Sequence, residues 1–226
     1  MIKRILFICT ALFLTGCVTP PKVITKQQAF PKVYAEKPLS ILVVPAINET
    51  TAADAIDLYS TTIAQPLAEA GYYVLSVPYT KKFLERQGVV EGAQATQVPL
   101  EKYKQLFGAD VVLFVTLKKW DTNYTVLSGD VTVSAKADMY STTTKEKLWN
   151  YDSTFVYVTS GNSGNLFADL VATAIQTALT DYVPVARIVN SNMIHSMPVG
   201  KYHKRYDTDQ KDMAVLEYKV KPKQGK

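Results

Sequence analysis

The sequence is poor in cysteine and histidine, with two of each in 226 residues. Both cysteines, Cys9 and Cys17, lie close to the amino terminus, so no thiol is present anywhere from position 18 onward. This absence excludes disulfide bonds, thiolate metal sites and a cysteine nucleophile from the rest of the chain. A chain of this length can bury a core large enough to fold without such cross-links.

The sequence also lacks a recognisable catalytic constellation. His195 and His203 both lie near the carboxy terminus, and a metal site there would need carboxylates folded around them. HExxH, P-loop and GxGxxG motifs are absent. Ser163 follows a Gly-Asn pair, but a nucleophile elbow needs glycine at the position of Asn165. We therefore predict a protein that is not an enzyme, with no catalytic residue, cofactor or metal, and we place a hydrolase last among the alternatives.

No apolar run is long enough to span a membrane, which takes roughly 20 residues. A basic start, the apolar residues 5–14 and the small residues before Cys17 follow the order of a secretory signal peptide. Residues 14–17, Leu-Thr-Gly-Cys, resemble a bacterial lipobox, which implies cleavage before Cys17 and acylation of that residue with palmitate-type chains. More than one acyl chain makes such an anchor durable. Val18 stands where an inner-membrane retention signal has aspartate, which indicates an outer-membrane address with the domain in the periplasm.

Positive charge is concentrated at the carboxy-terminal end. Residues 18–183 contain 14 Lys and Arg against 16 Asp and Glu, whereas residues 184–226 contain 9 against 4. A nucleic-acid partner is not expected at this address. The basic tail is therefore expected to meet anionic lipid headgroups or an acidic partner, or to be a solvated extension.

The pattern along the chain predicts four regions. Residues 18–37 contain prolines and lysines with little apolar periodicity, which indicates a linker between the lipid and the domain. The tail from residue 185 onward also shows only weak periodicity. The predicted regions are a signal peptide at 1–16, a lipidated linker at 17–38, an α/β domain at 39–183 and a basic, partly ordered tail at 184–226.

The first part of the domain alternates strands and helices. Residues 40–45 form a continuous apolar run, typical of a strand buried on both faces. A helix is predicted over 52–70, with a kink at Pro66 and an end at Gly71. A further strand is predicted at 72–78, helices at 80–86 and 99–107 around a loop at 88–97, and a strand at 109–117.

The second part of the domain alternates apolar and polar residues, which predicts antiparallel strands at 122–127, 131–140 and 148–159. A final helix is predicted at 166–182, ended by Pro184. The fold class is therefore α/β: a mixed sheet with a strand-helix-strand-helix-strand start, an antiparallel meander and a carboxy-terminal helix.

Aromatic residues are the main candidate for a contact surface, since the chain has fourteen tyrosines and two tryptophans. Tyrosine favours strands as well as interfaces, so cross-strand packing and a protein-binding face both remain open. The candidate partner contacts are Tyr124, Tyr140, Trp149 and Tyr151 in the meander, with Tyr202, Lys204 and Arg205 in the tail.

Three stretches together resemble a known family: residues 42–50 (LVVPAINET), 65–75 (QPLAEAGYYVL) and 200–206 (GKYHKRY). The family comprises Gram-negative lipoproteins of unknown function, typified by a meningococcal vaccine-candidate lipoprotein. The resemblance implies a fold similar to the TolB amino-terminal domain, an envelope role beside a CsgG-like pore lipoprotein, and homo-oligomer contacts. The family's third stretch reads Gly-Pro-Tyr-His-Pro, so Lys201 and Lys204 depart from it and any shared contact of the tail stays open.

These observations favour an outer-membrane-anchored periplasmic lipoprotein that acts as a scaffold or accessory subunit of a secretion or assembly complex. The alternative is a periplasmic binding module for a small ligand or glycan. Such a module would use the loops after the first and third strands, because open α/β sheets bind ligands at the carboxyl ends of their strands.

Overall fold

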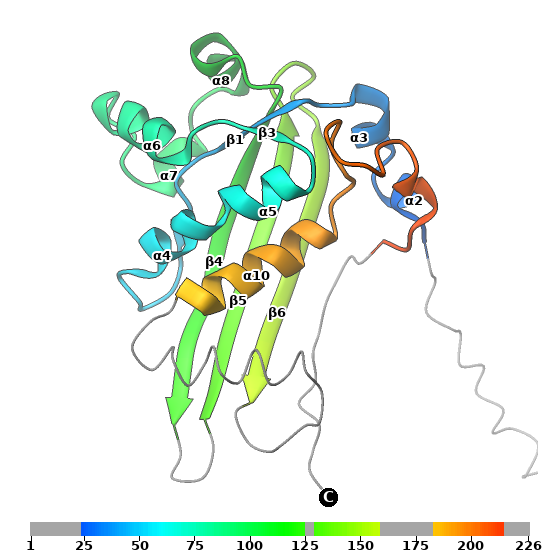
Figure 1. Cartoon of the computed structure of the whole chain (residues 1–226). Coiled ribbons are helices and arrows are strands. Elements are labelled where there is room, and N and C mark those ends of the chain that lie inside the picture. The colour runs from blue at the N-terminus through cyan, green and yellow to red at the C-terminus, as the bar shows by residue number, and fades with distance from the viewer. Residues whose placement is uncertain (1–23, 125–128, 159–182, 215–226) are drawn as a thin grey trace, which may run out of the picture.

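The computed structural model describes residues 24–124, 129–158 and 183–214. Its strands form a single mixed sheet, which Figure 1 shows running through the centre of the domain. The strands are β1 (Ser40–Val43), β2 (Ile47–Asn48), β3 (Tyr73–Val74), β4 (Val111–Tyr124), β5 (Gly129–Ser141) and β6 (Lys147–Val158).

Helices lie on both sides of this sheet and at its edge (Figure 1). The described helices are α2 (Lys26–Ala29), α3 (Pro31–Glu36), α4 (Ala55–Thr62), α5 (Ala64–Glu69), α6 (Val77–Arg86), α7 (Gly92–Ala95), α8 (Leu100–Phe107), α10 (Val183–His195) and the 3-10 helix η2 (Asp209–Lys211). None of them is long and apolar enough to cross a membrane.

The sheet has a parallel half and an antiparallel half. β1 pairs in parallel with β3 and with β4, and β2 also pairs in parallel with β4. β4, β5 and β6 pair antiparallel as a meander. The predicted fold class is confirmed: an α/β domain whose sheet starts with strand-helix units and continues as an antiparallel meander, with a helix near the carboxy terminus.

β1 is buried on both faces, as its continuous apolar run predicts. Ile41 and Val43 lie in a core with α4, α5 and α10 on one side of the sheet. Leu42 and Val44 lie on the other side, in a smaller core with α6, α7 and α8. The alternation of side chains along a strand places these neighbours in different cores.

The helix predicted over 52–70 is present as two helices, α4 and α5, that meet at Ile63. Pro66 explains the break, because its ring clashes with the carbonyl four residues earlier, at Thr62, where α4 ends. The strand predicted at 72–78 is shorter than expected, since Val77 and Pro78 open α6 instead. The predicted loop at 88–97 contains the short helix α7.

The ordered domain extends beyond both expected boundaries. Phe30 and Val33, placed in the linker by the sequence, are buried in the main core. Residues 183–195 form α10, which packs on α4 and includes Pro184 in its first described turn. The helix predicted at 166–182 lies outside the described residues.

Asp110 fixes the start of β1, and its replacement provides a test of the fold. Its carboxylate accepts hydrogen bonds from the backbone N–H groups of Leu39 (3.1 Å) and Ser40 (3.0 Å) and pairs with Lys104 at 2.8 Å. Burial acts to raise the pKa of this carboxyl, but the contacts with Lys104, Ser40 and Leu39 outweigh it and hold the pKa below its usual value. We expect Asp110→Ala to lower the free energy of unfolding by about 2 kcal/mol at neutral pH.

The pH dependence of this difference distinguishes the charged contacts from general packing. A carboxyl whose pKa is depressed by folding stabilises the fold above its unfolded pKa and loses that contribution as the pH falls through the folded value. The difference between Asp110→Ala and wild type should therefore shrink below about pH 4 in urea titrations. Asp57→Ala, which breaks an exposed pair with Lys81, should change stability by less than about 1 kcal/mol. If Asp110→Ala lowers the free energy of unfolding by the same amount at neutral pH and below about pH 4, this account is wrong.

Candidate functional site

A groove lies on the side of the sheet where α6, α7 and α8 pack. These helices bury the first part of β4 at Val112, whereas Phe114 and Thr116 further along the strand are only half-buried. The groove has a volume of about 350 Å³ and we call it the sheet groove. It is lined by the apolar side chains of Ile47, Val98, Leu100, Phe114 and Tyr140 and by the polar side chains of Thr96, Thr116, Lys136 and Asp138.

Aromatic rings form the floor of the sheet groove. Tyr140 meets Phe114 edge to face, with ring centroids 5.9 Å apart, and Phe114 meets the buried Tyr103 in the same way at 6.3 Å. The Tyr103 hydroxyl donates a hydrogen bond of 2.8 Å to the Ala95 carbonyl, which ties the ring to α7. The ammonium of Lys147 lies 5.5 Å from the centroid of Tyr140. The Tyr140 ring is therefore held in place before any ligand or partner arrives.

Charged side chains form one rim of the sheet groove. The Asp138 carboxylate lies 3.2 Å from Lys136 and 2.7 Å from Lys147. The hydrogen bond with Asp138 raises the pKa of Lys147, so this lysine stays charged at neutral pH. With two lysines around one carboxylate, the rim carries an excess of positive charge. The arrangement can bind an apolar group on the aromatic floor and a polar or negative group at the rim.

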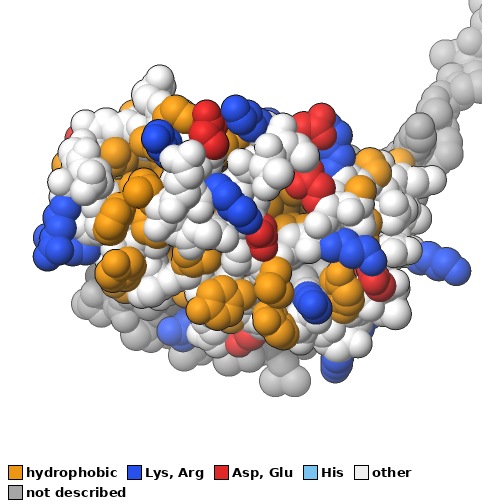
Figure 2. All heavy atoms as spheres, turned by 90° about the horizontal axis from the view of Figure 1, so that it is seen from above, with side chains coloured by type: hydrophobic (Ala, Val, Ile, Leu, Met, Phe, Trp, Pro, Cys, Tyr) orange, Lys and Arg blue, Asp and Glu red, His pale blue; other side chains and the backbone are white. Residues whose placement is uncertain are grey.

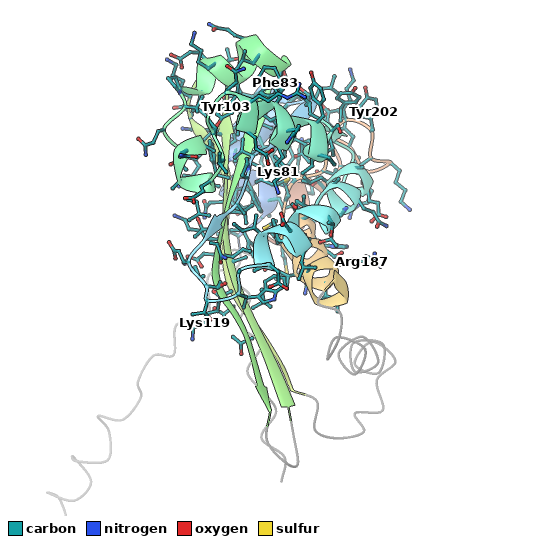
Figure 3. The ribbon with its side chains drawn as sticks, turned by 90° about the vertical axis from the view of Figure 1, so that its left-hand side faces the viewer. Lys81, Phe83, Tyr103, Lys119, Arg187 and Tyr202 are labelled. Carbon is teal, nitrogen blue, oxygen red and sulfur yellow. The ribbon has the colours of Figure 1, made fainter. Side chains whose placement is uncertain are left out.

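The tail residues gather at a different end of the domain. Tyr202 is 65% exposed and Lys204 is exposed, whereas Arg205 donates a 2.7 Å hydrogen bond to Asp212. In Figure 3 Tyr202 and Tyr103 lie on opposite sides of the sheet. A hollow of about 540 Å³ beside α5 is lined by Lys204, Arg205 and both histidines of the chain. Within the described residues, no group of three or more His, Cys, Asp and Glu side chains could hold a metal ion.

Two of the stretches that resemble a known family contribute to these hollows: residues 42–50 supply Ile47 to the sheet groove, and residues 200–206 line the hollow beside α5. The model of the "Putative lipoprotein GNA1162-like" family matches residues 29–202, more than half of the chain. The chain belongs to the GNA1162-like lipoprotein family. The matched range contains the whole lining of the sheet groove and ends at Tyr202.

Individual relatives agree with this membership. The chain is 32% identical over 148 residues to "Putative lipoprotein NMB1124/NMB1162" of Neisseria meningitidis serogroup B. The aligned region covers 64% of this chain and 69% of the relative. The crystal structure of lipoprotein GNA1162 from Neisseria meningitidis matches with a TM-score of 0.50 and 33% identity, over 63% of this chain and all of that one. A PelC dodecamer from Paraburkholderia phytofirmans is more distant, with a TM-score of 0.37 and 15% identity over 64% of this chain and 86% of that one. The family model and the two Neisseria relatives confirm the family resemblance expected from the sequence.

In this GNA1162-like lipoprotein two of the expected contact residues belong to the core. Trp149 is 1% exposed and Tyr151 is 5% exposed, and their rings stack with centroids 6.2 Å apart. Phe30, from the segment expected to be a linker, packs against Trp149 at 6.4 Å. The surface contact expected of Trp149 and Tyr151 is therefore replaced by a packing role, because residues before position 39 cover this side of β6.

The other expected residues of the GNA1162-like chain are partly described. Tyr124 is the last residue of β4, but its side chain lies outside the described part, as does Cys17. Phe114, Lys136 and Asp138 are not among the contact residues expected from the sequence. The alternation along β5 places Lys136 and Asp138 on the same face as Tyr140, so a reading of that face could have found them.

Proposed function

We propose that this protein is an envelope lipoprotein, anchored in the outer membrane through acylated Cys17, that serves as an accessory or scaffold subunit of a secretion or surface-assembly complex. Its domain works in the periplasm, and the sheet groove receives a protein partner. The family membership supports the lipid anchor. The partner that the family resemblance suggests is a CsgG-like pore lipoprotein, and homo-oligomer contacts are part of the same proposal.

The observation that carries the partner proposal is the anatomy of the sheet groove. An apolar floor with a charged rim is the usual build of a protein interface. Tyr140 is half-exposed and held between Phe114 and Lys147, so it offers an anchor that loses little conformational freedom on binding. A partner that inserts an apolar side chain over Phe114 and places a carboxylate near Lys136 would fit it.

Replacement of Tyr140 by alanine should weaken partner binding at least about thirtyfold, which corresponds to the 2 kcal/mol typical of an interface anchor. The measurement is crosslinking in intact cells, followed by purification from detergent-solubilised membranes and mass spectrometry. Tyr79→Ala, which removes a ring that is 64% exposed on α6, serves as the matched control and should leave the partner yield unchanged. Cys17→Ala tests whether anchoring is required.

A pore-forming lipoprotein recovered with the acylated wild type, and lost with Tyr140→Ala, is the result expected from the proposal. Recovery of the protein alone, or only with copies of itself, would contradict the accessory role. Equal loss with Tyr79→Ala would show that the groove is not the contact.

A second candidate function is a binding module for a small ligand or glycan. The volume of the sheet groove lies at the lower end of the range for small-molecule sites. Thermal denaturation across a panel of envelope metabolites tests it. A ligand at a hundred times its Kd should add about 2.7 kcal/mol to the free energy of unfolding. The gain should disappear in Tyr140→Ala, and a panel without any gain would favour the scaffold.

A further inference from the structure

The two ends of the described chain lie side by side. The Ala214 N–H donates a 2.8 Å hydrogen bond to the Ile24 carbonyl, and the Lys26 N–H donates one of 2.8 Å to Asp212. Thr25 and Met213 form an antiparallel bridge between these bonds. The segment that leads back to Cys17 and the segment that continues to Lys226 therefore leave the domain at the same place.

The anchor segment is too short to let the domain turn freely above a membrane. Six residues lie between Cys17 and Ile24, so seven Cα-to-Cα steps join the two. At full extension these steps span at most about 25 Å. A compact domain of this size has a radius of gyration of about 16 Å and is therefore about 40 Å across. Only the end of the domain that carries Ile24 can then lie close to the bilayer in which Cys17 is anchored.

This end of the domain carries an excess of positive charge. Residues 200–213 have four basic side chains against three aspartates, and the aspartates are already paired with Lys26, Lys37 and Arg205. Figure 2 shows basic and acidic side chains interspersed on the face seen from above. Elsewhere in the domain many lysines are paired, for example Lys104 with Asp110. Lys201, Lys204 and Lys211, in contrast, are exposed and have no ion pair within the part of the chain that the structure describes. In the sequence, residues 215–226 contain four further lysines against one glutamate.

Two large apolar side chains project from the same end. Tyr202 is 65% exposed and Met213 is 63% exposed, although both lie among charged residues. Tyrosine and lysine together are typical of a surface that meets the headgroup region of a bilayer. Anionic headgroups attract basic residues that lie within a Debye length, about 8 Å at physiological salt.

We propose that the end of the domain formed by residues 200–213 docks onto an anionic bilayer surface. Lys201, Lys204 and Lys211 lie over the headgroups, and Tyr202 and Met213 contact the interface. The docking orients the sheet groove, which is on the other side of the sheet from Tyr202, away from the lipid and toward partners. The proposal rests on the acylation of Cys17 in the proposed function.

A fluorescent probe at position 202 tests the docking. Acylated protein carrying Tyr202→Cys, labelled with an environment-sensitive nitrobenzoxadiazole, is reconstituted in vesicles of phosphatidylcholine alone or mixed with phosphatidylglycerol. The label is unique, because the chain has no other cysteine after Cys17. The emission should shift to the blue in the anionic vesicles only and return when salt is added. Met213→Cys provides a second position, and Tyr79→Cys, on the exposed face of α6, is the control that should not shift.

Charge variants test which residues hold the domain down. Each lysine near an anionic surface strengthens docking about fivefold, so alanine at 201, 204 and 211 should lower the docked-to-undocked ratio about a hundredfold. The control with the same loss of charge carries alanine at Lys82, Lys102 and Lys119, which lie away from this end, and should remain docked.

The outcomes separate this inference from the anchor on which it rests. Protein that fails to float with the vesicles lacks the anchor, and the lipoprotein proposal fails with it. Protein that floats but shows equal emission in neutral and anionic vesicles retains the anchor and overturns the docking. An equal loss of docking in the variant with alanine at 201, 204 and 211 and in its control with alanine at 82, 102 and 119 also overturns the docking proposal. A label shielded in cells but not in any vesicle would assign this end to an acidic protein instead.

Discussion

Replacing Gly71 with alanine should lower the free energy of unfolding by about 3 kcal/mol, which combines a left-handed backbone penalty with overpacking. Gly71 has a φ of +89°, and a Cβ at this position would lie 2.3 Å from the His203 amide nitrogen. The turn is also tied by hydrogen bonds, since Gly200 donates to Ala70 at 2.8 Å and Tyr202 donates to Gly71 at 3.0 Å. The segment of residues 200–203 would have to move away from α5 to make room for the added methyl group.

Gly88→Ala provides the matched control for this prediction. Gly88 has a φ of +83°, but a Cβ there would meet nothing within 4 Å. Its replacement should therefore show the backbone penalty alone, about 1 to 2 kcal/mol. In thermal denaturation Gly71→Ala should melt about 10 °C below wild type, since each kcal/mol shifts the Tm of a domain of this size by about 2–4 °C. Equal melting temperatures for the two variants would show that the contact with His203 is not tight.

The contact between Gly71 and the tail shows what the sequence could and could not predict. Gly71 was predicted to end a helix, because glycine tolerates the left-handed conformation that follows many helices. Gly200 approaches the same turn so closely that a Cβ on it would lie 2.4 Å from the Gly71 carbonyl oxygen. Because more than a hundred residues separate the two glycines, no local sequence pattern indicates this approach. Strand and helix periods are local, whereas close approaches between distant segments are not.

The same distinction explains the outcome for the candidate contact residues. Alternation along β6 showed that Trp149 and Tyr151 share one face of the sheet, but it could not show that this face is covered. The cover includes α3, which has six residues and therefore depends on tertiary contacts rather than on its own propensity. Tyr140 is half-buried, because it points to the opposite side of the sheet from Trp149.

Asp209→Ala should destabilise the domain by about 3–5 kcal/mol, because it leaves a buried ammonium without its charged partner. Asp209 is fully buried, and Lys26, 3.8 Å away, is 6% exposed. The carboxylate also accepts a 2.9 Å hydrogen bond from the Val199 N–H. Lys26 itself donates to the Met197 carbonyl at 2.7 Å, so the pair joins α2 to the segment after α10.

The pH dependence and two further variants identify the buried pair as the cause. Burial lowers the pKa of Lys26, and the charge of Asp209 opposes that shift, so the pKa should fall further in Asp209→Ala. A lysine with a depressed pKa destabilises the fold at low and neutral pH, and this contribution vanishes above its unfolded value. The deficit of Asp209→Ala should therefore shrink as the pH approaches 10.5, the ordinary lysine value. Urea titrations at neutral and alkaline pH measure the change.

Lys26→Met combined with Asp209→Leu should recover most of the stability that either single change loses, because a buried ion pair and an apolar pair of similar volume are often equivalent. Tyr34→Phe removes a hydroxyl that lies near Asp209 but makes no hydrogen bond of good geometry among the described residues, so it should change stability by less than about 1 kcal/mol. If the double variant is no better than Asp209→Ala, the loss comes from the Val199 contact instead. Because Lys26 lies two residues after Ile24, where the anchor segment enters the domain, the recovered double variant would also show that the junction needs tight packing rather than charge.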